Sequence, residues 1–275
     1  MRTLMILGKH QHATARPSLI VTGPATTGKT TALLEVGRTC HLAHTRRARP
    51  GDDRVPVAYV LVPPGATAKT LAAEFARYLG IPVTTRMTTA QITAAVCHTY
   101  TAAGTRLVLI DEIHRLNPRT SSGAEAADWL KDLTERVPAT IVYAGIDVTA
   151  SAVFTGVRGS QLAGRASLID CGALPARRGV REPFRELITA LEHALDLHAH
   201  RPGSLPKLVP YLHERTAGRI GSLARLIRQA AIEAILDGSE RITKTLLDGI
   251  TLDHLAEEHY RPRNPTRPRS RPHHR

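Results

Sequence analysis

The sequence predicts an α/β protein in which a parallel sheet is followed by a smaller all-α part. Up to Pro175, short apolar runs alternate with segments of helical periodicity, which is typical of a parallel sheet covered by helices on both faces. From Glu182 onward, only helical spacing recurs. The 275 residues provide room for one core of roughly 150–170 residues and a smaller second domain.

The predicted elements follow from these patterns in chain order. Continuous apolar runs predict strands over 18–22, 55–62, 106–110, 140–144 and 167–170. Apolar residues at helical spacing predict helices over 29–39, 68–79, 89–101 and 124–137, and then over 184–198, 205–215, 222–237 and 244–257. Trp129 shares the apolar face of its helix, so we expect it in the core.

We divide the chain into four parts. Residues 1–17 form a basic leader, 18–175 the α/β core, 176–257 a helical domain that starts with a basic linker, and 258–275 an Arg/Pro-rich tail that we expect to be disordered. No apolar run approaches the roughly 18–20 residues that cross a bilayer, and the start lacks the layout of a signal peptide. We therefore expect a cytoplasmic protein with no membrane partner.

The formal net charge of +13 is the most informative part of the composition. Arginines gather in residues 46–54 and again in residues 261–275. A strongly basic protein usually binds a polyanion, most often nucleic acid, although a GC-rich genome that favours Arg codons is an alternative source. The three cysteines are odd in number and far apart, so neither a disulfide framework nor a zinc knuckle is expected.

The segment after the first strand has the Walker A pattern of a phosphate-binding loop (P-loop). Its residues are Gly23, Pro24, Ala25, Thr26, Thr27, Gly28, Lys29 and Thr30, with Thr31 next in the following helix. The glycines let backbone N–H groups converge on phosphate oxygens, and the helix start adds its positive dipole end. We expect Lys29 to reach the β- and γ-phosphates of ATP, and the Thr30 hydroxyl to be a Mg²⁺ ligand.

A second acidic motif follows the third predicted strand and has the Walker B pattern. Residues 107–110 are apolar and deliver Asp111 to the carboxyl end of the sheet, where ligands bind in open α/β folds. We expect Asp111 to hold Mg²⁺ and Glu112 to polarise the attacking water as a general base. His114 completes an acidic box like that of nucleic-acid helicases, but the chain has no room for a helicase's second core domain.

With these motifs in view, the chain resembles the AAA+ ATPases, and more narrowly the TniB family of transposition ATPases, relatives of TnsC and of the Mu B protein. The resemblance covers roughly residues 15–255 and is carried by the two motifs together with the stretches 59–64, 141–145, 161–165 and 218–223. It implies a P-loop NTPase (AAA+) core with a C-terminal all-α lid domain.

The resemblance also implies roles for single residues. An arginine ahead of the last core strand completes the ATP site of a neighbouring subunit in AAA+ rings; Arg165 stands at that position, with Arg158 in reserve. Asp147 is the nearest candidate for the polar sensor after the fourth strand, and Arg219 for the lid arginine. Lys69, Arg86 and Thr88 are the candidates for contacts with DNA phosphates.

We therefore expect an ATP-dependent AAA+ ATPase that forms a ring or helical filament on duplex DNA without regard to sequence, and that recruits a transposase in target selection. A helicase loader or replication-initiation ATPase is an alternative with a similar core. A P-loop phosphotransferase that acts on a small molecule is another, against which Glu112 and the basic charge argue. A nucleotide-gated scaffold that barely hydrolyses ATP also stays open.

Overall fold

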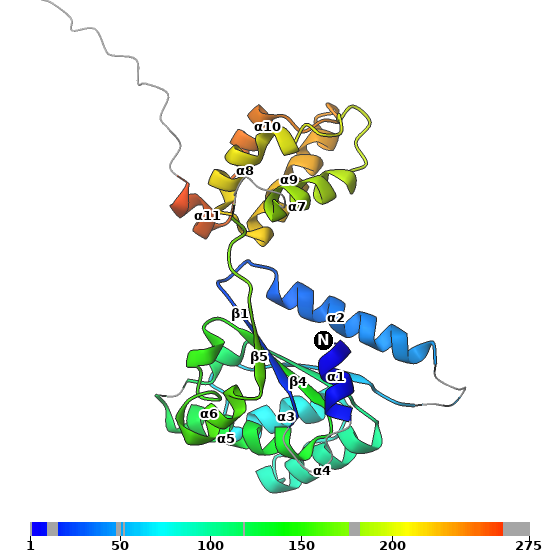
Figure 1. Ribbon diagram of the computed structural model, residues 1–275, viewed down its shortest axis with the longest axis vertical. Helices are drawn as coiled ribbons and strands as arrows, with labels where there is room; N and C mark the ends of the chain where they lie inside the picture. The colour runs from blue at the N-terminus through cyan, green and yellow to red at the C-terminus, as the bar shows by residue number, and fades with distance from the viewer. Residues whose placement is uncertain are drawn as a thin grey trace, which may run out of the picture. The chain divides into compact units, whose positions relative to one another are not determined.

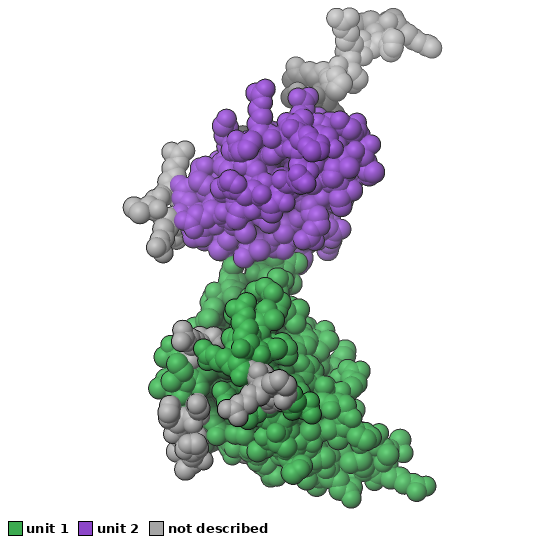
Figure 2. All heavy atoms as spheres, turned by 90° about the vertical axis from the view of Figure 1, so that its right-hand side faces the viewer, with its two compact units in different colours: residues 1–172 green, residues 173–275 purple. Residues whose placement is uncertain are grey.

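The computed structural model describes residues 2–9, 16–47, 51, 53–117, 119–175 and 182–260. The chain divides into two compact units, Met1–Gly172 and Ala173–Arg275, which Figure 2 shows in two colours. The expected linker at 176–181 and residues 261–275 of the expected tail lie outside the described residues. Among the helices that are described, none combines the length and apolar character that crossing a bilayer requires.

Unit 1 is built on a parallel sheet with the strand order β2-β3-β4-β1-β5. The strands are β1 Ser18–Thr22, β2 Val57–Leu61, β3 Leu107–Asp111, β4 Thr140–Gly145 and β5 Ala166–Asp170. All five predicted strands are present, with shifts of one or two residues at their ends. Strand β4 lies between β1 and β3, and it separates the strands that carry the two phosphate-site motifs.

Helices cover both faces of the central strands (Figure 1). On one face the core includes side chains of α3 Ala68–Tyr78, α4 Thr89–Ala102 and α5 Ser121–Arg136. Trp129 of α5 belongs to this core, where its indole N–H donates to the Thr93 hydroxyl at 2.7 Å, as its helical spacing predicted. On the other face α1 Arg2–Lys9 and α2 Lys29–Thr45 pack on the sheet.

Three features of unit 1 differ from the expectations. Helix α1 lies within the expected leader, where Leu4 and Met5 pack against the sheet core. Helix α6 Gly156–Ala163 precedes β5 in a segment with no predicted element. Strand β5 is exposed along most of its length, including Leu168 and Ile169, because it is an edge strand and β1 is its single partner among the described strands. The helices that were expected to cover both faces of the whole sheet therefore do not bury β5.

Unit 2 is helical, as predicted. Its helices are α7 Pro183–His193, α8 Val209–Thr216, α9 Ile220–Leu236, α10 Lys244–Gly249 and α11 His254–His259, and they enclose a separate apolar core. The single helix predicted over 244–257 is wrong. Helix α10 ends at Gly249, and the segment that follows buries Ile250 and Leu252. Asp253 then caps α11 by accepting a hydrogen bond from the Ala256 N–H at 3.1 Å.

Candidate nucleotide site

The P-loop connects β1 to α2 and contains backbone conformations that few residues adopt. Gly23 has φ +149° and Gly28 has φ +85°, while Thr26 between them has φ +63°. The end of β5 packs against the loop, since the Cys171 N–H donates to the Thr22 carbonyl at 2.7 Å. A Cβ on Gly23 would lie 2.4 Å from the Cys171 carbonyl oxygen, so this close approach requires glycine.

The Lys29 ammonium lies inside this loop. It donates to the carbonyl oxygens of Gly23 at 2.8 Å and Pro24 at 2.5 Å, and the residue is only 8% exposed. The Thr27 hydroxyl also donates to Pro24 at 2.9 Å, which helps to hold the curl of the loop. A buried ammonium beside converging backbone groups at a helix start has the chemistry of a site for phosphate oxygens.

The two sequence motifs meet at Thr30 and Asp111. The Thr30 hydroxyl donates to Asp111 Oδ2 at 2.7 Å, although 81 residues separate them and β4 lies between their strands. The other carboxylate oxygen, Oδ1, accepts the Glu112 N–H at 2.8 Å. A hydroxyl and a carboxylate side by side form an oxygen donor set that suits Mg²⁺, which usually keeps several waters and takes one or two carboxylates.

Tyr59 is a third member of this group that the sequence analysis missed. It stands on β2, and its hydroxyl donates to Asp111 Oδ2 at 3.0 Å. Burial and the neighbouring Asp111 carboxylate raise the pKa of Tyr59 to about 12, so the phenol stays protonated and able to donate. Only the pairing of β2 with β3 brings Tyr59 to Asp111, and periodicity contains no sign of it.

Glu112 occupies a turn with left-handed backbone, at φ +61°, directly after β3. Its carboxylate lies 3.0 Å from the Arg115 guanidinium and 3.6 Å from His114 Nε2. Arg115 also donates to the Val62 carbonyl at 2.9 Å, so it ties Glu112 to the end of β2. The three-residue spacing of Glu112 and Arg115 was a signal that could have identified this pair.

His114 links the second motif to the end of β4. Its Nδ1 accepts the Ile146 N–H at 3.2 Å, which places the ring proton of the neutral imidazole on Nε2, toward Glu112. A Cβ on Gly145 would lie 2.9 Å from His114 Nδ1, so the glycine makes room for the ring. The residue that follows Ile146, the predicted sensor Asp147, is exposed on the same loop and has φ +44°.

Arg165 lies at the amino-terminal end of the strands, whereas the P-loop lies at their carboxyl end. Its backbone carbonyl accepts the N–H of Ser18, the first residue of β1, whereas the loop follows the last residue of that strand. A five-residue strand spans about 17 Å, so this exposed arginine is remote from the loop of its own chain. The side chain of the reserve candidate, Arg158, lies outside the described ones.

The remaining predicted site residues lie elsewhere. Lys69 at the start of α3 donates to the Thr85 carbonyl at 3.0 Å, which brings it to the exposed loop that carries Arg86. Thr88 is also exposed, but its hydroxyl accepts the Gln91 N–H at 3.2 Å in the cap of α4. Arg219 belongs to unit 2, where it stands directly ahead of α9.

Comparison with known proteins adds a family and a fold. A family model described as bacterial TniB protein matches residues 1–169, which is more than half of the chain. No curated protein matches the chain significantly.

Several solved structures share the fold. The Orc1 protein of Aeropyrum pernix in complex with DNA has a TM-score of 0.65 at 17% identity, over 90% of this chain and 62% of that one. The ORC2 protein of the same organism, in ADPNP–ADP complexes, has a TM-score of 0.64 at 18% identity, over 90% and 64%. Cdc6p of Pyrobaculum aerophilum has a TM-score of 0.59 at 14% identity, over 85% and 62%.

At these identities the likeness concerns the fold alone, which is the AAA+ P-loop fold with a helical C-terminal region. The chain spans less than two thirds of the length of each of these three proteins.

Proposed function

The chain belongs to the bacterial TniB protein family, and on that premise we propose that it is an AAA+ ATP hydrolase that binds duplex DNA and acts in transposition. The 2.7 Å hydrogen bond between Thr30 and Asp111 is the observation that carries the catalytic part. It joins the phosphate loop to the acidic strand end across β4, which supports the assignment of Thr30 and Asp111 to a shared Mg²⁺ site.

Each residue of the site has a distinct task in this proposal. Residues 23–31 hold the phosphates with backbone N–H groups, and Lys29 moves from the loop carbonyls to the β- and γ-phosphate oxygens. Thr30 and Asp111 would hold Mg²⁺, which would supply charge neutralisation at the phosphates. Glu112 orients the attacking water and accepts its proton, and His114 and Arg115 position its carboxylate.

Arg165 supports an oligomeric form of the enzyme. Arg165 is exposed and lies at the amino-terminal end of the strands, away from its own P-loop. It is therefore suited to reach the γ-phosphate of ATP on another copy. ATP would then join copies in a ring or filament, and hydrolysis would loosen them. Asp147 and Arg219 are proposed as the groups that sense the nucleotide from the β4 loop and from unit 2.

Contact with DNA is supported by charge and by the exposed group near α3. The chain carries a net charge of +13, and Lys69, Arg86 and Thr88 are exposed around the loop between α3 and α4. Contacts of this kind reach phosphates rather than bases, so binding is expected to be blind to sequence and sensitive to salt. In this proposal the DNA-bound oligomer recruits a transposase, consistent with the family.

The first test measures steady-state ATP hydrolysis with and without duplex DNA, at low and moderate salt. Duplex DNA should raise the rate. Glu112→Gln should lower it by about 10²–10⁴-fold and still bind ATP, because it removes the general base and leaves the phosphate loop intact. An unchanged rate in Glu112→Gln would contradict the assigned chemistry. No response to DNA at any salt concentration would favour the scaffold or phosphotransferase alternatives.

A further inference from the structure

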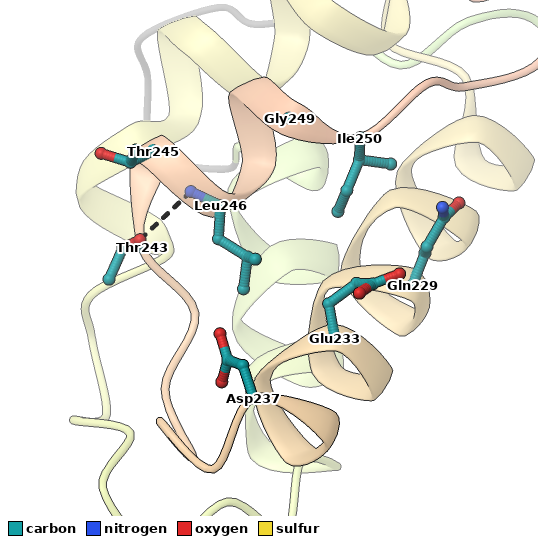
Figure 3. A pocket seen from close by; sticks show the side chains of 8 residues that line it. All are labelled: Gln229, Glu233, Asp237, Thr243, Thr245, Leu246, Gly249 and Ile250. Atoms are coloured by element: carbon teal, nitrogen blue, oxygen red, sulfur yellow. Dashed lines mark hydrogen bonds between the residues drawn. The ribbon is translucent and has the colours of Figure 1, made fainter.

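A shallow cavity of about 510 Å³ lies in unit 2 between α9 and α10 and contains neither of the phosphate-site motifs. We call it the α9–α10 groove. Glu233 on α9 and Asp237 directly after it form one side, and Leu246 and Ile250, on and directly after α10, face them from the other (Figure 3). Gln229, Thr243, Thr245 and Gly249 complete the lining.

The acidic side of the groove is available for a cation. Glu233 is exposed, and its carboxylate forms no ion pair with any other described residue. The Asp237 carboxylate is also exposed, and it accepts the Ser239 N–H at 2.8 Å. The two carboxylates lie four residues apart, on α9 and directly after it, so they follow each other along the same row of the surface.

An apolar row accompanies the acidic one. Ile232 is 50% exposed and Leu236 is 76% exposed, and their spacing places them beside Gln229 and Glu233 on α9 and Asp237 directly after it. Leu246 on the opposite side is partly buried against the core of unit 2. Ile232 and Leu236 do not line the groove, but they lie on the surface beside it. The groove and this adjoining surface therefore offer carboxylates and apolar groups to the same occupant, which must carry cations and compact apolar groups together.

Residues 261–275 of this chain, the basic segment, have that composition. They follow Tyr260 and include six arginines and no acidic residue. Pro262, Pro265 and Pro268 recur at intervals of three residues, which is one turn of a polyproline II helix. A proline-rich segment loses little conformational entropy on binding because its backbone is already restricted, and arginines beside the prolines can pair with acidic residues.

We propose that the basic segment binds the α9–α10 groove of its own chain, with prolines against Leu246 in the groove and Leu236 beside it, and arginines on Glu233 and Asp237. Fifteen extended residues reach up to about 50 Å. A domain of this size has a radius of gyration of about 12 Å, so the segment can reach the groove from Tyr260. The inference does not depend on ATP hydrolysis.

Trypsin reports directly on this contact in the full chain, because it cleaves after Arg263 and Arg269 but not at the Arg–Pro bonds of the segment. The rate of cleavage at these two sites is followed by mass spectrometry at early times. A synthetic peptide of residues 261–275 supplies the rate for an unbound segment. We expect the full chain to be cut at least about threefold more slowly than the peptide, since exposed ion pairs contribute modestly.

A double variant tests the groove itself. Glu233→Gln with Asp237→Asn removes both charges and keeps a side-chain oxygen at position 237 that can accept the Ser239 N–H. The basic segment of this variant should be cut at the rate of the free peptide. Glu186→Gln with Glu214→Gln removes two exposed charges of unit 2 that do not line the groove, and it should keep the protection. Protection should also weaken as salt rises.

Three results would overturn the proposal. The first is a full chain cut as fast as the peptide. The second is equal loss of protection in the two double variants. The third is protection that grows with protein concentration, which would mean that the basic segment binds a different copy.

Discussion

At the scale of single residues, the phosphate site depends on a few close approaches. Gly23 faces the Cys171 carbonyl at a distance that no Cβ tolerates, and Gly145 makes room for His114 in the same way. These contacts bring the ends of β5 and β3 against neighbouring loops. The spacing of the sequence motif identifies Gly23 as a loop glycine, but Cys171 as its partner follows only from the pairing of β1 with β5.

Tyr59 leads to a prediction about the metal site. Tyr59→Phe removes the hydroxyl that donates to Asp111 Oδ2 and leaves the ring in place, so Asp111 should be held less firmly for Mg²⁺. A net hydrogen bond contributes about 1 kcal/mol, which corresponds to a loss of roughly three- to tenfold in the Mg²⁺-dependent affinity for ATP. A fluorescent ATP analogue titrated with Mg²⁺ and with chelator measures this loss.

Tyr78→Phe is the matched control for this prediction. It removes the hydroxyl of Tyr78 on α3, which donates to the Val57 carbonyl at 3.0 Å. Val57 is on β2, like Tyr59, but this hydrogen bond does not involve Asp111. Binding of the nucleotide without Mg²⁺ should be unchanged in both variants. Equal Mg²⁺ dependence in Tyr59→Phe and the wild type would mean that Tyr59 does not support Asp111.

At the scale of elements, the turn after α7 is organised by a buried carboxylate. Glu192 accepts the N–H groups of Gly203 at 2.7 Å and Leu205 at 2.8 Å. It also contacts the His200 ring at 3.1 Å and the Ser204 hydroxyl at 3.2 Å. Burial raises the pKa of Glu192, but the hydrogen bonds from Leu205, Gly203, His200 and Ser204 outweigh it and lower the pKa below its ordinary value of 4.5.

This shift predicts how unit 2 responds to acid. A carboxyl group with a lowered pKa in the folded state contributes stability in full above 4.5, and that contribution is lost as the pH falls through the lower value. Glu192→Gln should lower the free energy of unfolding by about 1–3 kcal/mol at pH 7. Below pH 4.5, the stability of this variant should depend less on pH than that of the wild type. Urea unfolding of both proteins from pH 7 down to pH 3 measures the difference, and parallel pH profiles would contradict it.

Two other elements show where periodicity is insufficient. The strand predicted over 167–170 was expected to be covered on both faces, yet β5 is an exposed edge strand because β1 is its single partner among the described strands. Residues 244–257 keep helical spacing, yet the chain turns at 250–253 to bury Ile250 and Leu252 in the core of unit 2. In both cases the position of a neighbouring element decides the outcome, and local spacing has no information about that position.

At the scale of the whole molecule, the distance of Arg165 from its own P-loop predicts that one copy completes the site of another. Arg165→Ala keeps an intact loop and lacks the arginine, whereas Lys29→Ala keeps the arginine and lacks the loop lysine. Each variant alone should hydrolyse ATP poorly. Mixed in equal amounts they should recover up to about a quarter of the wild-type rate, since that share of interfaces joins an intact loop to an intact arginine.

The control for this mixture pairs Arg165→Ala with a double variant that carries both changes. That mixture contains no intact arginine, so it should stay inactive. If Arg165→Ala alone hydrolyses ATP at the wild-type rate, or if the first mixture recovers nothing while both variants still bind DNA, the shared site is wrong.

The sequence by itself determined the order of the five strands, the helical character of unit 2, and the positions of the two motifs at 23–30 and 111–112, because these depend on short-range periodicity and on fixed motif spacing. The tertiary structure alone decided that Tyr59 supports Asp111, that His114 and Arg115 flank Glu112, and that Arg165 lies away from its own loop. It also revealed the acidic and apolar groove between α9 and α10. Each of these depends on strand order or helix packing, which bring together residues that are far apart in the chain, and a local pattern cannot encode such neighbours.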